Sequence, residues 1–282
     1  MIKTDVSAPV KPEKESGALK FLYKNPIGRI MLRLLRAKWV SVLAGAFLDT
    51  RLSKPLIEPF LRKNKIDLSE YESDGFTCFN DCFCRRVKPG MRPFDNDGDA
   101  LASPCDGLLS VYKIERGGVY PIKQSKYSIE SLLRNTALAE EFLDGYIYIF
   151  RLCVNHYHRY HYPVSGSKGG NTRIKGTLHT VRPIALEDGP VFCENSREYT
   201  VIDSENFGRI VQMEVGAMLV GKIYNLHGAK VIEKGEEKGT FLYGGSTVIL
   251  LTGENVKPAE DFLKNTKEGF ETPVKAGERI NE

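Results

Sequence analysis

The sequence predicts an α+β fold, with a helical N-terminal part followed by a mainly antiparallel β body. Three observations support this fold class. Apolar residues recur at helical spacing soon after residue 26, short β-branched and aromatic runs bounded by glycine or proline begin after residue 100, and one helical interlude (128–143) interrupts them. We therefore expect a polar tail over 1–18, a helical region over 19–95 and a β-rich domain over 96–282.

The composition is that of a folded globular protein. Of 282 residues, 41% are hydrophobic and 27% are charged, so the chain can form a sizeable core. The net charge of +4 is too small to predict a nucleic-acid partner. No signal peptide is expected, so the six cysteines should stay reduced. Cys78, Cys82 and Cys84 lack the paired spacing of zinc sites, and we expect buried thiols and no metal.

A basic amphipathic helix is predicted near the N-terminus. Its apolar stripe and its arginine face consist of Ile27, Ile30, Met31, Leu34 and Leu35, and of Arg29, Arg33 and Arg36. Such a helix either packs its stripe on the domain or lies on an anionic membrane surface. The most apolar stretch, Trp39 to Leu48, is about half of the roughly 20 residues that a membrane span needs, so any membrane contact would be peripheral.

The remaining elements follow from local patterns. Residues 56–88 are predicted to be helical, because Phe76, Phe79 and Phe83 recur at helical spacing before Pro89 and Pro93. Strands are predicted at 107–111, 145–150, 209–213, 219–223 and 247–251.

Two segments carry an acid and a group of bases. Ser103 to Gly107 (SPCDG) precedes a strand and should hold Asp106 in a defined position, although a plain Asx-turn would look the same. Asn155 to Pro163 (NHYHRYHYP) holds three of the five histidines, and histidine is the usual general base. A metal site is the alternative for this cluster, but no acidic residue accompanies it. In an extended segment His158 and His161 would point to opposite faces.

A third segment carries the candidate nucleophile. In Tyr243 to Thr247 (YGGST), two glycines leave the Gly245 carbonyl open to the Ser246 hydroxyl, although a hairpin turn would use the same residues. An aspartate, a histidine and this serine together suggest nucleophilic catalysis. Val248 stands where the G-x-S-x-G elbow of hydrolases needs glycine, which argues against an ordinary esterase.

In this order and at these separations, the three segments resemble the signatures of the phosphatidylserine decarboxylase family. Phe79 to Asp95 (FNDCFCRRVKPGMRPFD) and Val215 to Gly221 (VGAMLVG) resemble two further segments of that family, and the resemblance covers about residues 20–260. The chain departs from the commoner pattern in having Cys105 for alanine and Gly244 for leucine, which leaves Gly245 and Ser246 intact.

The resemblance implies a proenzyme that processes itself. His161, oriented by Asp106, would take the proton of Ser246, whose oxygen attacks the Gly245 carbonyl. The cut would give fragments 1–245 and 246–282 that stay together as a heterodimer, with Ser246 converted to a covalent pyruvoyl group and no metal. The two-fragment unit could also form a homo-oligomer.

The resemblance also implies the reaction and its place. The pyruvoyl group would act as an electron sink in converting phosphatidylserine to phosphatidylethanolamine and CO2. His158 would bind the substrate carboxylate or deliver a proton. A lipid substrate implies a peripheral enzyme on the cytoplasmic side of the cell membrane, and it favours membrane contact by residues 27–48.

Three other functions fit parts of the sequence. A pyruvoyl enzyme acting on a soluble amino acid would leave the amphipathic start unexplained. A serine hydrolase using Asp106, His161 and Ser246 would stay uncut and react with fluorophosphonates. A biotinyl or lipoyl carrier would need one exposed lysine at a hairpin, and Lys230, Lys234 and Lys238 offer no single candidate.

Overall fold

The centre of the molecule is a nine-stranded sheet. The computed structural model describes residues 8–11, 43, 45–73, 75–123, 125–176, 195–216, 223–242 and 246–282. Within them the strand order is β11-β6-β8-β9-β13-β4-β1-β14, with β7 also paired to β8. The strands are β1 (Gly107–Lys113), β4 (Tyr146–Leu152), β6 (Gly166–Lys168), β7 (Thr172–Ile174), β8 (Arg197–Ser204), β9 (Gly208–Val215), β11 (Lys230–Ile232), β13 (Ser246–Thr252) and β14 (Thr272–Val274).

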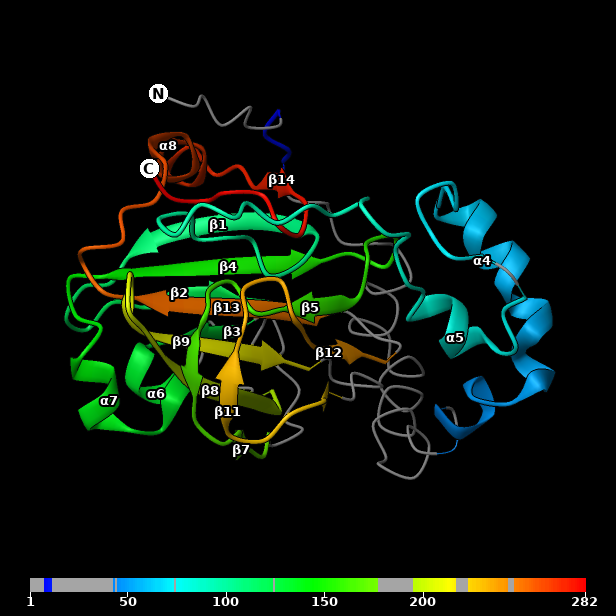
Figure 1. Cartoon of the computed structure of the whole chain (residues 1–282), viewed down its shortest axis with the longest axis horizontal. Helices are drawn as coiled ribbons and strands as arrows, with labels where there is room; N and C mark the ends of the chain where they lie inside the picture. Colours follow the sequence, from blue (N-terminus) through cyan, green and yellow to red (C-terminus); the bar gives the residue numbers. More distant parts are fainter. Residues whose placement is uncertain are drawn as a thin grey trace, which may run out of the picture.

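Two smaller sheets and several short helices complete the described fold, and residues 45–48 are helical as well (Figure 1). The small sheets join β10 (Ile223–Asn225), β12 (Glu237–Phe241) and β5 (Arg159–His161), and β2 (Tyr120–Ile122) with β3 (Ser125–Tyr127). The helices are η1 (Arg51–Leu56), α4 (Ile57–Lys63), α5 (Phe79–Phe83), α6 (Ile129–Leu133), α7 (Thr136–Glu140) and α8 (Glu260–Lys267). Every strand pairing among the described residues is antiparallel, which confirms the predicted α+β class with a mainly antiparallel body.

Both faces of the central sheet are buried. Successive side chains of a strand point to opposite faces, and β13 accordingly sends Val248 and Leu250 into one core and Ile249 and Leu251 into another. The first core is closed by β5, β12 and α8, and the second by α6, α7 and the β2–β3 hairpin. Burial on both sides explains why β13 is a continuous apolar run rather than an alternating one.

The helical N-terminal region is more broken than predicted. The expected helix over 56–88 consists of η1 with α4 and, after a non-helical stretch, the short α5. Lys65 adopts a left-handed backbone (φ 52°) just after α4, and Asp67 forms an Asx-turn to the Ser69 amide. The phenylalanines that suggested one long helix instead pack against α4 in a separate core. Figure 1 shows α4 and α5 at one end of the sheet, on the side of β5 and β12.

Of the other local predictions, four strands are confirmed, one helix is corrected, and two predictions lie mostly or wholly outside the described residues. The strands expected at 107–111, 145–150, 209–213 and 247–251 are confirmed as β1, β4, β9 and β13. The interlude at 128–143 is two helices, because Arg134 at φ 49° ends the first. Of the strand expected at 219–223 only Ile223 is described, and the amphipathic helix of residues 27–35 lies outside the described residues.

The described part of the N-terminal tail lies against the body. Val10 exchanges both backbone hydrogen bonds with Glu271, just before β14. No helix built from the described residues has both the length and the apolar character needed to cross a bilayer.

Candidate active site

Asp106 is clamped by an arginine from the segment that precedes it. Its two carboxylate oxygens accept hydrogen bonds from Nε and Nη2 of Arg92, at 2.8 and 2.7 Å, and Oδ1 also accepts from the Ala276 amide at 2.9 Å. Both side chains are almost fully buried. A two-pronged guanidinium contact of this kind fixes a carboxylate in position. The acid therefore uses its oxygens for contacts distant in sequence and not for a local Asx-turn.

His161 ends β5 beside the turn that carries Asp106. Its backbone amide donates to the Pro104 carbonyl at 2.8 Å, which joins the two segments. Its Nδ1 lies 3.0 Å from the Gly235 carbonyl oxygen. A carbonyl only accepts, so Nδ1 carries the proton and Nε2 keeps its lone pair. Nε2 lies 3.4 Å from the Tyr157 hydroxyl.

Gly235 is required for this arrangement. It has φ +84°, a backbone conformation that favours glycine, and a Cβ there would lie 2.9 Å from the Phe94 ring. The Phe94 ring itself packs on His161, with centroids 5.3 Å apart. Burial lowers the pKa of His161 below its ordinary value, although the Gly235 hydrogen bond opposes this. The imidazole is therefore neutral at pH 7, the form that can act as a base.

Asp106 and His161 are neighbours without a direct hydrogen bond. Asp106 binds Arg92 and Ala276, whereas His161 is oriented by Gly235. The Asp106 charge still acts on His161, since it is among the groups that raise the His161 pKa against the effect of burial. Catalytic hydrogen bonds are often long before reaction, and the orienting role expected for Asp106 stays a prediction.

His158 lies just before β5 and faces different neighbours from His161. Its ring packs on Phe83 of α5, with centroids 4.0 Å apart, while His161 packs on Phe94 and Tyr157. Its Nδ1 lies 2.9 Å from the His156 carbonyl oxygen and so carries the proton. Its Nε2 is buried and has no hydrogen-bond partner among the described residues. Burial, aided by the charge of Arg85, lowers the His158 pKa to about 3.

Ser246 is the first residue of β13 and is buried. It pairs with Leu152 at the end of β4, and the loop after Leu152 leads to His158 and β5. The preceding strand, β12, pairs with β5 and ends at Phe241. Gly244 and Gly245 lie outside the described residues. In the central sheet β13 lies between β4, whose following loop carries the histidines, and β9.

Two buried polar atoms of residues near the candidate side chains in the sequence lack hydrogen-bond partners in the described chain. Buried polar atoms in proteins nearly always have a partner, yet Thr247 Oγ1 and His158 Nε2 have none within the part of the chain that the structure describes. Among the described residues no group of three or more histidine, cysteine or acidic side chains could hold a metal ion. The cysteines at 78, 82, 84 and 105 are buried thiols.

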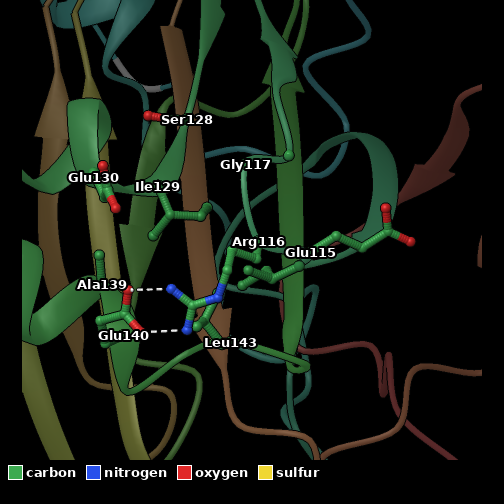
Figure 2. A pocket seen from close by; sticks show the side chains of 11 residues that line it. Glu115, Arg116, Gly117, Ser128, Ile129, Glu130, Ala139, Glu140 and Leu143 are labelled. Atoms are coloured by element: carbon green, nitrogen blue, oxygen red, sulfur yellow. Dashed lines mark hydrogen bonds and ion pairs between the residues drawn. The ribbon is translucent and has the colours of Figure 1, made fainter.

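A cavity elsewhere in the molecule is not part of this site. It measures about 60 Å³ and is lined by residues within 114–118, 128–130 and 139–143. Figure 2 shows the Arg116 guanidinium reaching the Glu140 carboxylate beside it, a bidentate contact of 2.8 and 3.0 Å. Asp106, His161 and Ser246 do not line this cavity.

Comparison with known proteins identifies the family of the chain. Residues 79–282, which include all four candidate side chains, match the model of the family described as phosphatidylserine decarboxylase. The chain belongs to this family. Its relatives include phosphatidylserine decarboxylase proenzyme 2 of Clostridium acetobutylicum, 44% identical over 95% of this chain and 92% of the relative. They also include the phosphatidylserine decarboxylase proenzymes of Clostridium botulinum strain Hall (42% identical, 95% and 94% covered) and Ruminiclostridium cellulolyticum (42%, 93% and 90%).

Sequence reasoning missed three residues that position the site of this decarboxylase family member. Arg92 clamps Asp106, Gly235 orients His161, and Arg85 donates to the carbonyls of Asn155 and His156. Both arginines stand in the FNDCFCRRVKPGMRPFD segment that resembles the family. Their place in this segment was the one signal that could have found them. Their hydrogen-bond partners lie far away in the sequence, so no local pattern predicts those contacts.

Proposed function

We propose that this chain is made as a proenzyme, cuts itself between Gly245 and Ser246, and then decarboxylates phosphatidylserine to phosphatidylethanolamine. The observation that carries the proposal is the family match over 79–282, within which a clamped carboxylate and a neutral histidine lie on joined segments. The fragments 1–245 and 246–282 form the working heterodimer.

In the first stage His161 is the base. Its Nε2 carries a lone pair, which the Tyr157 hydroxyl contacts at 3.4 Å before reaction, and accepts the Ser246 hydroxyl proton. Asp106 stabilises the resulting imidazolium through its charge. The Ser246 oxygen attacks the Gly245 carbonyl carbon, and the peptide C–N bond breaks to give an ester. Loss of the Ser246 α-proton expels the Gly245 carboxylate and leaves a double bond. Water then replaces the nitrogen, ammonia leaves, and a pyruvoyl group remains.

In the second stage the pyruvoyl group supplies an electron sink for the electrons left by departing CO2. We assign the proton transfer of this stage to His158. With a pKa of about 3 its imidazole is neutral and offers no positive charge to a carboxylate. Its Nε2, unpartnered among the described residues, can instead accept and return a proton. We therefore favour the proton role of His158 over carboxylate binding.

The N-terminal region brings the enzyme to its substrate surface. Leu43, Phe47, Leu52 and Leu56 are exposed apolar side chains, with Leu52 at 77% exposure. In the sequence these residues follow the basic amphipathic segment predicted at 27–36. An apolar surface next to basic residues is the combination that holds peripheral proteins on anionic lipid. We place the enzyme at the cytoplasmic face of the cell membrane.

The membrane proposal predicts weaker vesicle binding when this surface becomes polar. The double substitution Leu52→Ser with Leu56→Ser should lower co-sedimentation with phosphatidylserine vesicles at least about threefold, because burying each leucine in lipid contributes about 1.5–3 kcal/mol. Val231→Ser is the matched control, since Val231 is 75% exposed in β11. Equal binding by the double variant and the wild type would assign the leucines a different role.

Intact mass tests the central proposal. Purified wild-type protein should appear as 1–245 and 246–282, the smaller fragment carrying a pyruvoyl mass in place of serine, and should release CO2 from phosphatidylserine. Ser246→Ala should stay whole and inactive, whereas Ser204→Ala at the end of β8 should behave as wild type. A wild-type chain that remains whole and inactive on the lipid rejects the proposal.

A further inference from the structure

The proposed maturation needs a second base. After Ser246 has moved the Gly245 acyl group to its own oxygen, the α-proton of Ser246 must leave before the carboxylate is expelled. His161 is assigned to the hydroxyl proton. The Ser246 side chain points the same way as those of Val248 and Leu250, into the core that β5 helps to close. The α-proton lies in the plane of the sheet instead, so its base must approach along a neighbouring strand.

The hydrogen bonds at the end of β9 show what faces β13 there. Val215 lies opposite Arg197 of β8 and opposite Thr247 of β13. The Gly216 amide donates to the Ser196 carbonyl at 2.9 Å, which is the bond beside a non-hydrogen-bonded pair of antiparallel strands. Val215 and Arg197 form that pair. The amide and the carbonyl of Val215 therefore point the other way, towards Thr247.

The α-proton of Ser246 points at this same carbonyl. Along an antiparallel strand, neighbouring residues use their amides on opposite sides. Thr247 bonds to β9, so Ser246 bonds to Leu152 of β4 and turns its Cα–H towards β9. An oxygen that accepts from one amide is also approached by the Cα–H of the residue before it, at a C···O distance of about 3.3–3.6 Å. For the Thr247 amide, that oxygen belongs to Val215.

Lys123 reaches the same oxygen from a hairpin that covers the sheet. It lies in the turn between β2 and β3, and its Nζ donates to the Val215 carbonyl at 3.1 Å. Ile122 and Val215 belong to one core, which holds the hairpin over the end of β9. Sharing one oxygen places Nζ no more than about 7 Å from Cα of Ser246, and nearer for neighbouring directions of approach. The flexible lysine stem can close this distance.

The backbone and the ionisation of Lys123 both fit a functional lysine. Its φ is 59°, a left-handed conformation that glycine adopts without strain and that costs a lysine free energy. Such strain gathers at functional positions. Burial lowers the pKa of Lys123 from its ordinary 10.5 to about 7. About half of the amines are then neutral at pH 7, and a neutral amine can donate to Val215 while keeping a lone pair for a proton.

We propose that Lys123 is the catalytic base of the elimination step and takes the α-proton of Ser246 from the β9 side. The proton moves to Nζ, the Cα–H electron pair becomes the Cα–Cβ double bond, and the Cβ–Oγ bond breaks with its electrons leaving on the Gly245 carboxylate. The lysinium returns the proton to Cβ as the enamine becomes an imine, which water converts to the pyruvoyl ketone and ammonia. The assignment rests on the proposed function and adds the group that carries this step.

Hydroxylamine separates this step from the one before it. It cleaves an ester between Gly245 and Ser246 but no peptide bond there, so it detects a chain that has shifted and not eliminated. Lys123→Met removes the amine, whereas Lys123→Arg keeps a positive donor for Val215 that stays protonated at neutral pH. Lys126→Met is the matched control, because Lys126 is an exposed lysine of β3 in the same hairpin. Thermal unfolding first checks that each variant folds.

We expect both Lys123 variants to form the pyruvoyl fragment at least about 100-fold more slowly, the typical contribution of a general base. Hydroxylamine should cut them and release a 246–282 fragment that begins with serine. His161→Gln, which lacks the first base, should stay whole with or without hydroxylamine, and Lys126→Met should process as wild type. Intact mass follows all of these products. Where Lys123→Met is unstable, Lys123→Arg carries the comparison.

Two outcomes overturn this role of Lys123. Pyruvoyl formation by Lys123→Arg at the wild-type rate would mean that the hydrogen bond to Val215 is needed and the base is not. Folded, uncut Lys123 variants that resist hydroxylamine would place Lys123 before the ester. A wild-type chain that neither cleaves nor decarboxylates would instead overturn the proposed function, so the failures are distinguishable.

Discussion

His158 and His161 each use one ring nitrogen, Nδ1, to donate a hydrogen bond to a backbone carbonyl. His158 uses the carbonyl of His156, and His161 uses that of Gly235. Each carbonyl fixes the neutral tautomer with the lone pair on Nε2. The two rings then differ in what surrounds that lone pair, because Nε2 of His161 has the Tyr157 hydroxyl nearby and Nε2 of His158 has no partner in the described chain. This difference supports the two separate proton-transfer roles that we propose for these histidines.

The buried His158 makes the stability of the fold depend on pH. Its pKa is about 3 in the folded chain, against an ordinary value of 6.5, so as pH falls the unfolded chain takes up the proton first. The contribution of His158 is complete above about pH 6.5 and is lost as pH falls toward 3, at up to about 1.4 kcal/mol per pH unit. In the uncut Ser246→Ala background, adding His158→Gln should remove that slope from urea unfolding measured between about pH 6 and pH 5. Identical slopes with and without His158 would contradict the buried neutral imidazole.

Asp106 is expected to matter more for self-cleavage than the other carboxylate bound to Arg92. Asp106→Asn removes the charge that favours the imidazolium of His161 and should slow self-cleavage at least about tenfold, within the range typical of general acid–base groups. Glu70→Gln is the control, because Glu70 accepts from Nη1 of Arg92 but is 37% exposed. Cleavage is followed by intact mass after synthesis. Equal rates for both variants would give Asp106 a structural role only.

At the scale of elements, a buried ion pair joins the small sheet to the large one. Lys238 of β12 donates to Glu214 of β9 at 2.6 Å, and both side chains are inaccessible to water. Lys238 also donates to Asn225 of β10. The pair holds β12 against the central sheet. It also means that Lys238 is no exposed attachment lysine of a carrier module.

Removing only the lysine of the Lys238–Glu214 ion pair should strongly destabilise the fold. Lys238→Met leaves Glu214 buried without its cation, and we expect a loss of about 3–5 kcal/mol in the free energy of unfolding. Adding Glu214→Gln should recover part of the loss, since no unpaired charge then remains. Glu58→Gln, which removes the exposed pair with Arg62, should change stability by less than about 1 kcal/mol. Urea unfolding of these variants measures the differences, and an additive double variant would contradict the coupling.

At the scale of the whole molecule, the position of β13 explains how a cut chain can stay assembled. All seven residues of β13 are buried, and the strand pairs with β4 on one side and β9 on the other. The segment after it adds α8 and β14, the latter paired with β1. The proposed cut therefore frees the N-terminal end of a central strand without releasing the strand.

The two fragments are expected to separate only when the fold is lost. In size-exclusion chromatography without denaturant, 1–245 and 246–282 should elute together. In strong denaturant they should part, because burial of apolar surface and not a covalent bond then holds them. Elution of a free 246–282 fragment under native conditions would contradict this arrangement.

The sequence by itself determined the fold class and four of the five strands predicted from it, and it supplied the side chains that we propose for the site. These features have local causes: a buried strand needs a run of apolar β-formers, and self-cleavage chemistry needs a serine after an unshielded glycine carbonyl. The prediction of one helix failed at residues 64–78: Phe76 packs in a non-helical part of this segment, and only Phe79 and Phe83 lie in a helix, α5. A local period cannot distinguish these two uses.

Only the tertiary structure decided which partners those side chains have. Arg92 meets Asp106 across 14 positions, Arg85 meets Asn155 across 70, and His161 meets Gly235 across 74. Such pairings depend on strand register and on how β5 and β12 dock on the central sheet, which no short pattern encodes. The tautomers of the two histidines follow from those long-range contacts, because burial removes the water that would otherwise satisfy each group.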